Sequence, residues 1–315
     1  MLVSVVIPAW NAAEYLREAI ESVLAQTYKD IEIIVVDDGS TDHTQQICAG
    51  FAPQVKYHYQ PNDGTHGAGA RARGILEAKG EWVALLDQDD RWFPKKIEKQ
   101  LQALMECPGA TVAFTGFHQI DSQGLVVSKP FSGAPSGDVF HTLLTVNPYI
   151  PSSALLSRSV LDHCGLPITN LGAADYDLWL RIARCSQILV VDECLTEYRI
   201  HETAFSANRR RLVMAARQTL EQHKSQLHPN CLECQRSFRK GWSLISKFAA
   251  RACLDEYHAA AKSGELSHAL GFLREAIQLA PRQVFRPRQF LAVSKNLGLA
   301  MIRLIKNGFA TTLKV

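Results

Sequence analysis

Acidic side chains follow two apolar segments that have the composition of buried strands. Residues 31–36 (IEIIVV) lead into residues 37–38 (DD), and residues 82–86 (WVALL) lead into residues 87–90 (DQDD). Short β-branched runs are typical of buried parallel strands, and ligands of open α/β sheets bind beyond the carboxyl ends of the strands. Two groups of carboxylates at that edge would repel an anionic ligand unless a hard divalent cation lay between them. Because oxygen ligands of this kind favour Mg²⁺ or Mn²⁺, the pattern predicts a site for a metal-bound phosphate compound.

The segments around these carboxylates alternate between strand-like and helix-like patterns. Apolar runs predict strands at 3–7, 31–36, 55–59 and 82–86. A capping-box-like sequence at 11–14 (NAAE) predicts the start of the first helix, and a glycine-rich loop at 62–69 leads into the third. The alternation predicts a doubly wound, mainly parallel α/β sheet. Further strands are expected at 112–117, 125–128, 150–156, 188–191 and 196–200.

The pattern changes near residue 205, where long helical segments replace the alternation. We therefore expect an α/β domain at 1–205 and an α-helical C-terminal domain at 206–315. Residues 261–281 resemble the second helix of a tetratricopeptide unit. Since stacked repeats need about three units for stability, one copy predicts a single helical hairpin. A last helix is expected at 290–304, where it either lies on a bilayer surface or packs as ordinary core.

Charge is divided unevenly between these two parts. The net charge of +3 combines 15 basic and 25 acidic side chains before residue 205 with 19 basic and 6 acidic ones from residue 205 onward. The basic C-terminal part favours an anionic membrane surface or lipid phosphate as its partner, or it docks onto the acidic half. No RNA- or DNA-binding motif accompanies it, so nucleic acid is the least favoured partner.

Cysteine usage and hydropathy point to the cytoplasm. The N-terminus lacks the basic flank of a signal peptide, and no stretch approaches the ~20 apolar residues of a membrane span. Eight cysteines without a framework pattern suit a reducing compartment. Cys231 and Cys234 form one CxxC, with His223 and His228 before it and Cys253 after it. Only half of a recognised zinc spacing is present, so free thiols on a helix are the favoured interpretation.

Five segments occur in an order that resembles the catalytic domain of family 2 glycosyltransferases, which have the GT-A fold. They are residues 4–11 (SVVIPAWN), 36–42 (VDDGSTD), 70–74 (ARARG), 86–90 (LDQDD) and 174–181 (ADYDLWLR), and residues 198–201 (YRIH) match the usual ending. The resemblance covers about two-thirds of the chain. It implies an inverting enzyme that uses Mn²⁺ or Mg²⁺ and a nucleoside-diphosphate sugar.

Donor-binding roles follow from the resemblance. It makes Asp89 the metal ligand, and Asp87 the contact to ribose or to a metal-bound water. Asp38 resembles the carboxylate that accepts a hydrogen bond from the base ring, whereas Asp37 contacts ribose or orients the loop. Arg71 resembles the family's nucleotide- or phosphate-facing arginine. A backbone wall of the nucleotide pocket is expected from Pro8, Ala9 and Asn11.

The resemblance also identifies a general base and two departures from the family pattern. Asp175, at the start of a helix, would accept the proton of the acceptor hydroxyl. His201 either reaches the metal or diphosphate or is structural. The family's usual Glu-Asp is replaced here by Ala174 before Asp175, and its usual Ala-Arg-Asn ends in Ala72.

The expected function is transfer of a sugar, with a UDP-sugar as favoured donor, to a hydroxyl of a glycan or lipid-linked acceptor in cell-surface polysaccharide synthesis. The alternative is a catalytically silent glycan-binding or scaffold protein of the same fold, suggested by Ala174 and Ala72. We expect the protein in the cytoplasm, with the inner membrane face as a candidate peripheral contact.

Overall fold

The computed structural model describes residues 1–167, 173–286, 289 and 291–295. The chain divides into two compact units. The first consists of Met1–Ala207 and Gln218–Phe238, and the second of Asn208–Arg217 with the chain from Arg239 onward. Sequence alone placed one boundary at residue 205. The structure begins the second unit near that position but assigns the segment Gln218–Phe238 to the first unit.

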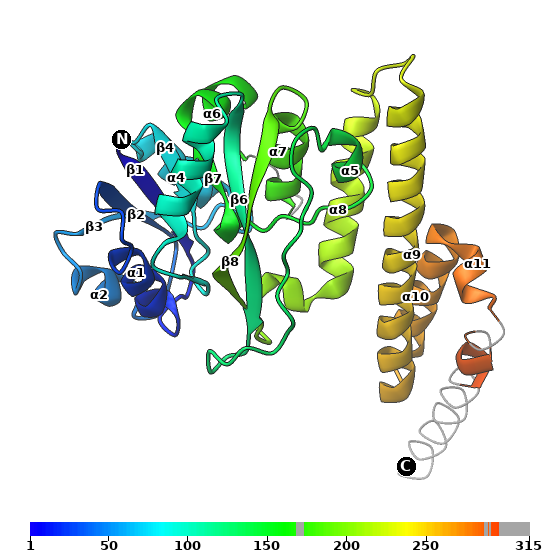
Figure 1. The fold of residues 1–315 in the computed structure, drawn as a ribbon. Helices are drawn as coiled ribbons and strands as arrows, with labels where there is room; N and C mark the ends of the chain where they lie inside the picture. Colours follow the sequence, from blue (N-terminus) through cyan, green and yellow to red (C-terminus); the bar gives the residue numbers. More distant parts are fainter. Residues whose placement is uncertain (168–172, 287–288, 290, 296–315) are drawn as a thin grey trace, which may run out of the picture. The chain divides into compact units, whose positions relative to one another are not determined.

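An eight-stranded mixed sheet forms the centre of the first unit, with strand order β3-β2-β1-β4-β7-β6-β8-β5 (Figure 1). The strands are β1 (Val3–Ala9), β2 (Ile31–Asp38), β3 (Val55–Gln60), β4 (Trp82–Leu85), β5 (Arg91–Trp92), β6 (Ala110–Ile120), β7 (Leu155–Ser157) and β8 (Gln187–Arg199). Strands β3, β2, β1 and β4 are parallel to one another, and β6 is parallel to β8. Strand β7 runs antiparallel to both β4 and β6, and β5 runs antiparallel to β8. The predicted mainly parallel α/β class is confirmed.

Helices cover both faces of the parallel strands. The helical segments of this unit are α1 (Leu16–Leu24), α2 (Thr44–Ala49), α3 (Ala68–Glu77), α4 (Lys96–Glu106), α5 (Phe140–Leu143), η1 (Pro151–Ser153), α6 (Arg158–Cys164), α7 (Ala174–Ile182) and η2 (Phe205–Ala207). On one face, Val3, Val5 and Ile7 of β1 share a buried cluster with side chains of α1 and α4. Side chains alternate along a strand and every residue of β1 is buried, so both of its faces are covered, and the one polar side chain, Ser4, donates to Glu32 Oε1 at 2.5 Å.

Helix α3 lies unusually close to β1 at Gly74. A Cβ atom at this position would lie 2.3 Å from Val6 Cγ1 and 3.3 Å from Val36 Cγ2. Only glycine fits without displacing the helix or the strand. This contact fixes the height of α3 above the sheet, and the helix carries Arg71 one turn earlier.

Several local expectations differ from the structure because tertiary contacts decide them. The Asn11 side chain does not cap α1, because its Oδ1 accepts a hydrogen bond from Thr41 N at 2.9 Å, and the helix begins later, at Leu16. Residues 125–128 form only an isolated bridge, between Ile120 and Val126. Residues 150–156 begin as the η1 turn, and the two strands expected between 188 and 200 are one irregular strand, β8.

The second unit is helical. Helices α8 (Arg209–Lys224) and α9 (Leu232–Ser263) contribute to both units, whereas α10 (Leu266–Leu279) and α11 (Pro281–Val284) belong to the second. Gly264, with φ of 89°, permits the turn between α9 and α10, whose apolar sides enclose Tyr257, Ala269 and Ala276. Most of the helix expected at 290–304 lies outside the described residues. Within the part of the chain that the structure describes, no helix is both long and apolar enough to cross a bilayer.

Candidate active site

The carboxyl ends of β1, β2 and β4 meet at one edge of the sheet. In the register of β1 and β2, Ala9 lies beside Asp37, and Pro8 lies beside Val36. Strand β4 ends earlier, with the Leu86 amide donating to Val6 O at 3.1 Å. Proline has no backbone N–H group to donate. Because β4 has already ended at this level, proline at position 8 removes no hydrogen bond between β1 and β4. This early end of β4 places residues 87–90 beside the last residues of β1.

Arg71, Asp87 and Asp175 come together at this edge from three different elements. Arg71 Nη2 on α3 donates to Asp87 Oδ1 at 2.5 Å. Asp175 lies in the first turn of α7. Burial raises the pKa of its carboxyl above the ordinary value, the Arg71 guanidinium opposes that shift, and the negative charge of Asp87 adds to it. A carboxylate with a raised pKa is a better proton acceptor than an exposed aspartate.

Asp89 and His201 form a second pair. His201 Nε2 lies 2.8 Å from Asp89 Oδ2, and His201 Nδ1 lies 2.8 Å from Thr203 Oγ1. The Nε2 and Oδ2 atoms are hydrogen-bonded to each other, and the carboxylate oxygen of Asp89 is a donor that suits Mg²⁺ and Mn²⁺. Two protein ligands would leave the remaining positions to substrate phosphate and water, as is common for Mg²⁺ and Mn²⁺. The residues present therefore fit the expected metal.

A buried arginine holds this pair in place. Arg199 is 1% exposed and donates from Nε to Asp89 O at 2.8 Å and from Nη2 to Glu18 Oε2 at 2.7 Å. Its backbone amide donates to Asp90 Oδ1 at 2.8 Å, while Ser152 Oγ donates to Asp90 Oδ2 at 2.5 Å. Burial raises the pKa of Asp90 well above its ordinary value, and the charges of Asp89 and Asp87 add to this shift. These contacts tie the loop after β4 to the end of β8, which carries His201.

Sequence reasoning missed Asp90, Arg199 and Ser152 as site residues. Asp90 and Arg199 lie within the segments that carry the family resemblance, and this location in the sequence could have identified them as site residues. Ser152 lies in the η1 turn, far away along the chain. No spacing in the sequence connects it to the acidic loop.

Asp37 and Asp38 at the end of β2 have different partners. Asp37 Oδ1 accepts from Ser40 N at 2.8 Å, and its Oδ2 accepts from the Tyr57 hydroxyl at 2.7 Å. Asp38 accepts from Gln60 Nε2 at 2.8 Å and from Asn62 Nδ2 at 3.2 Å, and burial raises its pKa. Both oxygens of Asp37 thus bind groups near the β2 loop, which favours the loop-orienting role among the alternatives for that residue.

The β1 loop is tied to both neighbouring loops. The backbone N–H of Asn11 donates to Ser40 Oγ at 2.8 Å, and Asn11 has a positive φ of 46°. On the other side, Gln88 Oε1 accepts from Trp10 N at 2.6 Å. The backbone of residues 8–11 therefore lies between the loop after β2 and the 87–90 loop.

The sequence matches the family model for glycosyl transferase family 2 over residues 4–165. An uncharacterized glycosyltransferase of Rickettsia typhi, RT0329, is 36% identical over 211 residues, which cover 64% of this chain and 64% of that protein. The Escherichia coli UDP-Glc:alpha-D-GlcNAc-diphosphoundecaprenol beta-1,3-glucosyltransferase WfaP is 32% identical over 212 residues, covering 66% of this chain and 81% of that protein. The chain thus spans less than two-thirds of the length of the first of these relatives.

Solved structures share the fold at lower identity. TarS 1–349 of S. aureus in complex with UDP has a TM-score of 0.61 at 18% identity, covering 99% of this chain and 92% of that one. The mannosyltransferase PcManGT of Pyrobaculum calidifontis in complex with GDP-Man and Mn²⁺ has a TM-score of 0.60 at 19% identity, covering 96% of this chain and 86% of that one. The first unit thus has the GT-A architecture. With the family model matching more than half of the sequence, the chain belongs to glycosyl transferase family 2.

Proposed function

We propose that this protein is an inverting, metal-dependent glycosyltransferase that moves a sugar from a nucleoside-diphosphate sugar to an acceptor hydroxyl. The observation that carries the proposal is the convergence of Arg71, Asp87 and Asp175 at the edge where the Asp89–His201 pair also lies. One side of such a site can hold a diphosphate, and the other side can accept a proton. A glycosyl transfer to a hydroxyl needs both.

Donor binding is assigned to the side formed by β1, β2 and the loop after β4. Asp38 accepts from the base ring, the backbone of Pro8, Ala9 and Asn11 forms the wall, and Asp87, oriented by Arg71, meets the ribose. Asp89 and His201 would hold Mn²⁺ or Mg²⁺. When bound, that ion supplies positive charge that stabilises the leaving diphosphate.

Asp175 is assigned as the general base. The acceptor oxygen attacks the anomeric carbon as its proton moves to the Asp175 carboxylate. The bond between that carbon and the diphosphate oxygen breaks with its electron pair, so the configuration inverts. Asp177, two residues further along α7, is bound to Arg181 and to His223 Nε2, so Asp175 stands as the base without help from that carboxylate.

For the donor we favour a UDP-sugar, and for the acceptor a glycan or lipid-linked sugar in cell-surface polysaccharide synthesis. WfaP is named for UDP-Glc and a diphosphoundecaprenol-linked acceptor, and TarS binds UDP. PcManGT binds GDP-Man, so the fold itself accepts more than one base.

A panel of nucleotide sugars with and without Mn²⁺ tests the donor assignment. We expect one donor to raise the thermal midpoint only when Mn²⁺ is present, because a ligand at about 100 times its dissociation constant adds about 2.7 kcal/mol of stability. Differential scanning fluorimetry measures this directly. Equal stabilisation with and without the ion would remove metal dependence from the proposal.

A catalytically silent glycan-binding protein is the second candidate, because Ala174 and Ala72 stand where the family has polar residues. Asp89 and Asp175 are both present at the site, which favours catalysis. Donor hydrolysis in the presence of Mn²⁺ separates the two functions: the enzyme releases nucleotide slowly without acceptor, and a binding protein releases none.

The basic C-terminal region predicts binding to anionic membranes. Residues 205–315 carry 19 basic and 6 acidic side chains. Near a membrane surface each basic residue contributes about 1 kcal/mol, and salt screens the attraction within about a Debye length.

We expect the full-length protein to co-sediment with vesicles containing phosphatidylserine and to be released as salt rises. Removal of residues 286–315 should weaken this binding and leave metal-dependent donor binding intact. Failure to bind anionic vesicles at low salt would point to a protein partner instead.

A further inference from the structure

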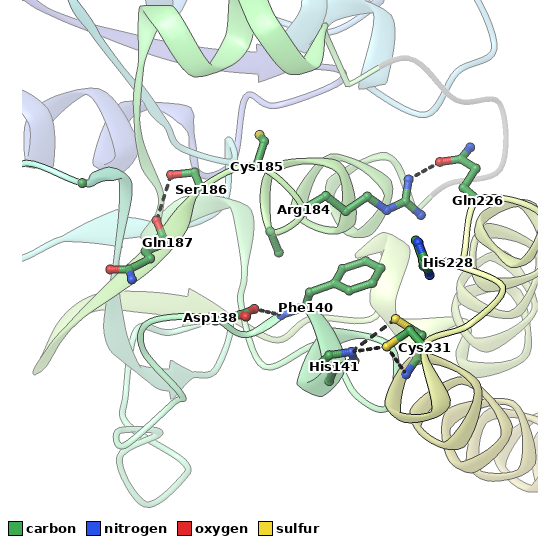
Figure 2. Close-up of a pocket in the computed structure, with 13 residues that line it drawn as sticks. Asp138, Phe140, His141, Arg184, Cys185, Ser186, Gln187, Gln226, His228 and Cys231 are labelled. Carbon is green, nitrogen blue, oxygen red and sulfur yellow. Dashed lines mark hydrogen bonds between the residues drawn. The ribbon is translucent and has the colours of Figure 1, made fainter.

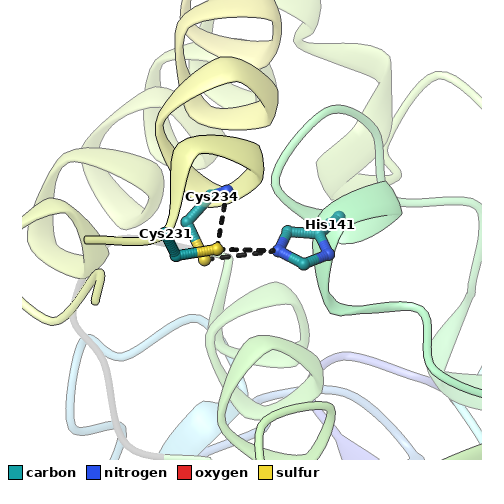
Figure 3. Close-up of side chains that lie close together, drawn as sticks. All are labelled: His141, Cys231 and Cys234. Atoms are coloured by element: carbon teal, nitrogen blue, oxygen red, sulfur yellow. Dashed lines mark hydrogen bonds between the residues drawn. The ribbon is translucent and has the colours of Figure 1, made fainter. Parts of the chain in front are cut away.

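A cluster of metal-ligating side chains lies within the first unit, separate from the acidic edge. His141 belongs to α5, Cys231 immediately precedes α9, and Cys234 lies in the first turn of α9. One ligand atom of each residue lies within 4.8 Å of the others. Figure 3 shows both sulfur atoms beside the same ring nitrogen of His141. Nothing in the proposed glycosyl transfer uses these residues.

We propose that His141, Cys231 and Cys234 form a zinc site that fastens α5 to the start of α9. His141 Nε2 lies 3.3 Å from Cys234 Sγ and 3.7 Å from Cys231 Sγ. In a tetrahedral zinc site with bonds of about 2.3 Å to sulfur and about 2.05 Å to nitrogen, a sulfur and a nitrogen ligand lie about 3.6 Å apart. The three side chains are therefore arranged as ligands without any rearrangement of the backbone.

The surroundings of the Cys231 sulfur favour its thiolate, which is the form that binds zinc. Cys231 stands at the N-terminus of a long helix, whose exposed amides favour negative charge. Cys234 N donates a hydrogen bond to Cys231 Sγ at 3.3 Å.

The carboxylate of Glu233 lies on the side of the His141 ring that is opposite to the sulfur atoms. Glu233 Oε1 lies 3.7 Å from His141 Nδ1, the ring nitrogen that faces away from the sulfur atoms. Carboxylates in this position orient a ligating imidazole and keep Nε2 free for the metal. Glu233 thus lies near the nitrogen that the outer partner of a ligating histidine binds, at a distance longer than a hydrogen bond.

Three protein ligands leave the fourth tetrahedral position open. The cluster lines a pocket of about 780 Å³ that is also lined by Arg184 and His228 (Figure 2). Water from this pocket can complete the coordination.

The spacing of the sequence concealed this site. His223, His228 and Cys253 are the potential ligands that stand near the CxxC in the sequence, and because they complete no recognised zinc spacing, free thiols are the interpretation that the sequence favours. His223 instead binds Asp177 Oδ1 at 2.9 Å, and Cys253 lies in the core of the second unit. The third ligand, His141, is 90 residues away from Cys231 along the chain. Zinc binding would close that long loop, and its binding free energy would add to the stability of the fold.

Titration of the reduced, metal-free protein with Co²⁺ under anaerobic conditions tests the proposal. We expect a thiolate-to-cobalt charge-transfer band that saturates at one ion per chain and disappears when Zn²⁺ is added. A Co²⁺ ion bound by Asp89 and His201 has no sulfur ligand, so it gives no such band. Cys231→Ser and Cys234→Ser should each weaken the band, because one thiolate remains, and the double variant Cys231→Ser/Cys234→Ser should abolish it. His141→Ala should weaken Co²⁺ binding at least ~10-fold, since even outer partners cost that much.

A second pair of thiols provides the matched control. Cys164 Sγ and Cys185 Sγ lie 3.1 Å apart in the same unit. The double variant Cys164→Ser/Cys185→Ser should keep the full band. X-ray absorption at the zinc edge of the unmodified protein needs no variant to fold, and we expect two sulfur scatterers at about 2.3 Å. Three results would each overturn the proposal. They are absence of the band, survival of the band in Cys231→Ser/Cys234→Ser, and a Cys231–Cys234 disulfide in protein purified without oxygen.

Discussion

Asp89→Asn is expected to abolish sugar transfer. The substitution keeps the size of the side chain, so Arg199 can still bind the backbone carbonyl at this position. It removes the negative charge that a divalent ion needs, and without the ion nothing stabilises the charge of the leaving diphosphate. The stabilisation of the protein by donor plus Mn²⁺ should disappear together with transfer. Both are measured on the same preparation, by nucleotide release and by thermal shift.

Asp162→Asn is the matched control for this change. Asp162 lies exposed on α6. The same chemical substitution there should leave transfer and metal-dependent donor binding unaltered. Turnover of Asp89→Asn at the unmodified rate would refute the metal assignment.

Asp175→Asn is expected to slow transfer by at least ~10²-fold, because positioned general bases contribute about that much or more. The amide keeps the shape of the carboxylate and removes the proton acceptor. Donor affinity should change little, since Asp175 is assigned to the acceptor side. Single-turnover transfer rates and donor titrations separate the two effects. Equal losses of donor binding and of turnover would instead place Asp175 in the donor pocket.

The pH dependence of the transfer rate provides a second test of Asp175 as the general base. Burial raises the pKa of this carboxyl, and a base works only when deprotonated. Activity should therefore be complete above the raised pKa and fall as the pH drops through it, at a higher pH than for an ordinary aspartate. In Asp175→Asn the residual activity should no longer fall in this pH range. If the fall at low pH persists unchanged in that variant, the titration of another group causes it.

Local sequence patterns predicted the strands that build the site. β1, β2 and β4 are short apolar runs buried on both faces, and their composition alone identifies them. The order of those strands then places Asp37, Asp38 and Asp87 at one edge, as the general rule for parallel sheets requires.

Features that depend on distant contacts could not be predicted in this way. The Asn11 side chain had a plausible local role as a helix cap, and the contact with Thr41 on another loop replaces it. Residues 125–128 have strand composition but bridge β6 at a single point, and Leu125 remains 65% exposed. Arg199 and Ser152 acquire their roles only when β8 and η1 reach the acidic loop. The hydrophobic periodicity of a sequence carries no information about contacts between such distant segments.

The close approach of α3 to β1 has a consequence for engineering the enzyme. A Cβ atom at position 74 would lie 2.3 Å from Val6 Cγ1, so a larger residue there requires the Val6 side chain, the strand or helix α3 to shift. A shift of α3 would move Arg71 away from Asp87, and the contact assigned to that carboxylate would lose its support. We therefore expect enlargement of residue 74 to weaken the Arg71–Asp87 contact, and with it donor binding, without altering any residue assigned to the nucleotide; shrinking Val6 in the same chain should restore the contact.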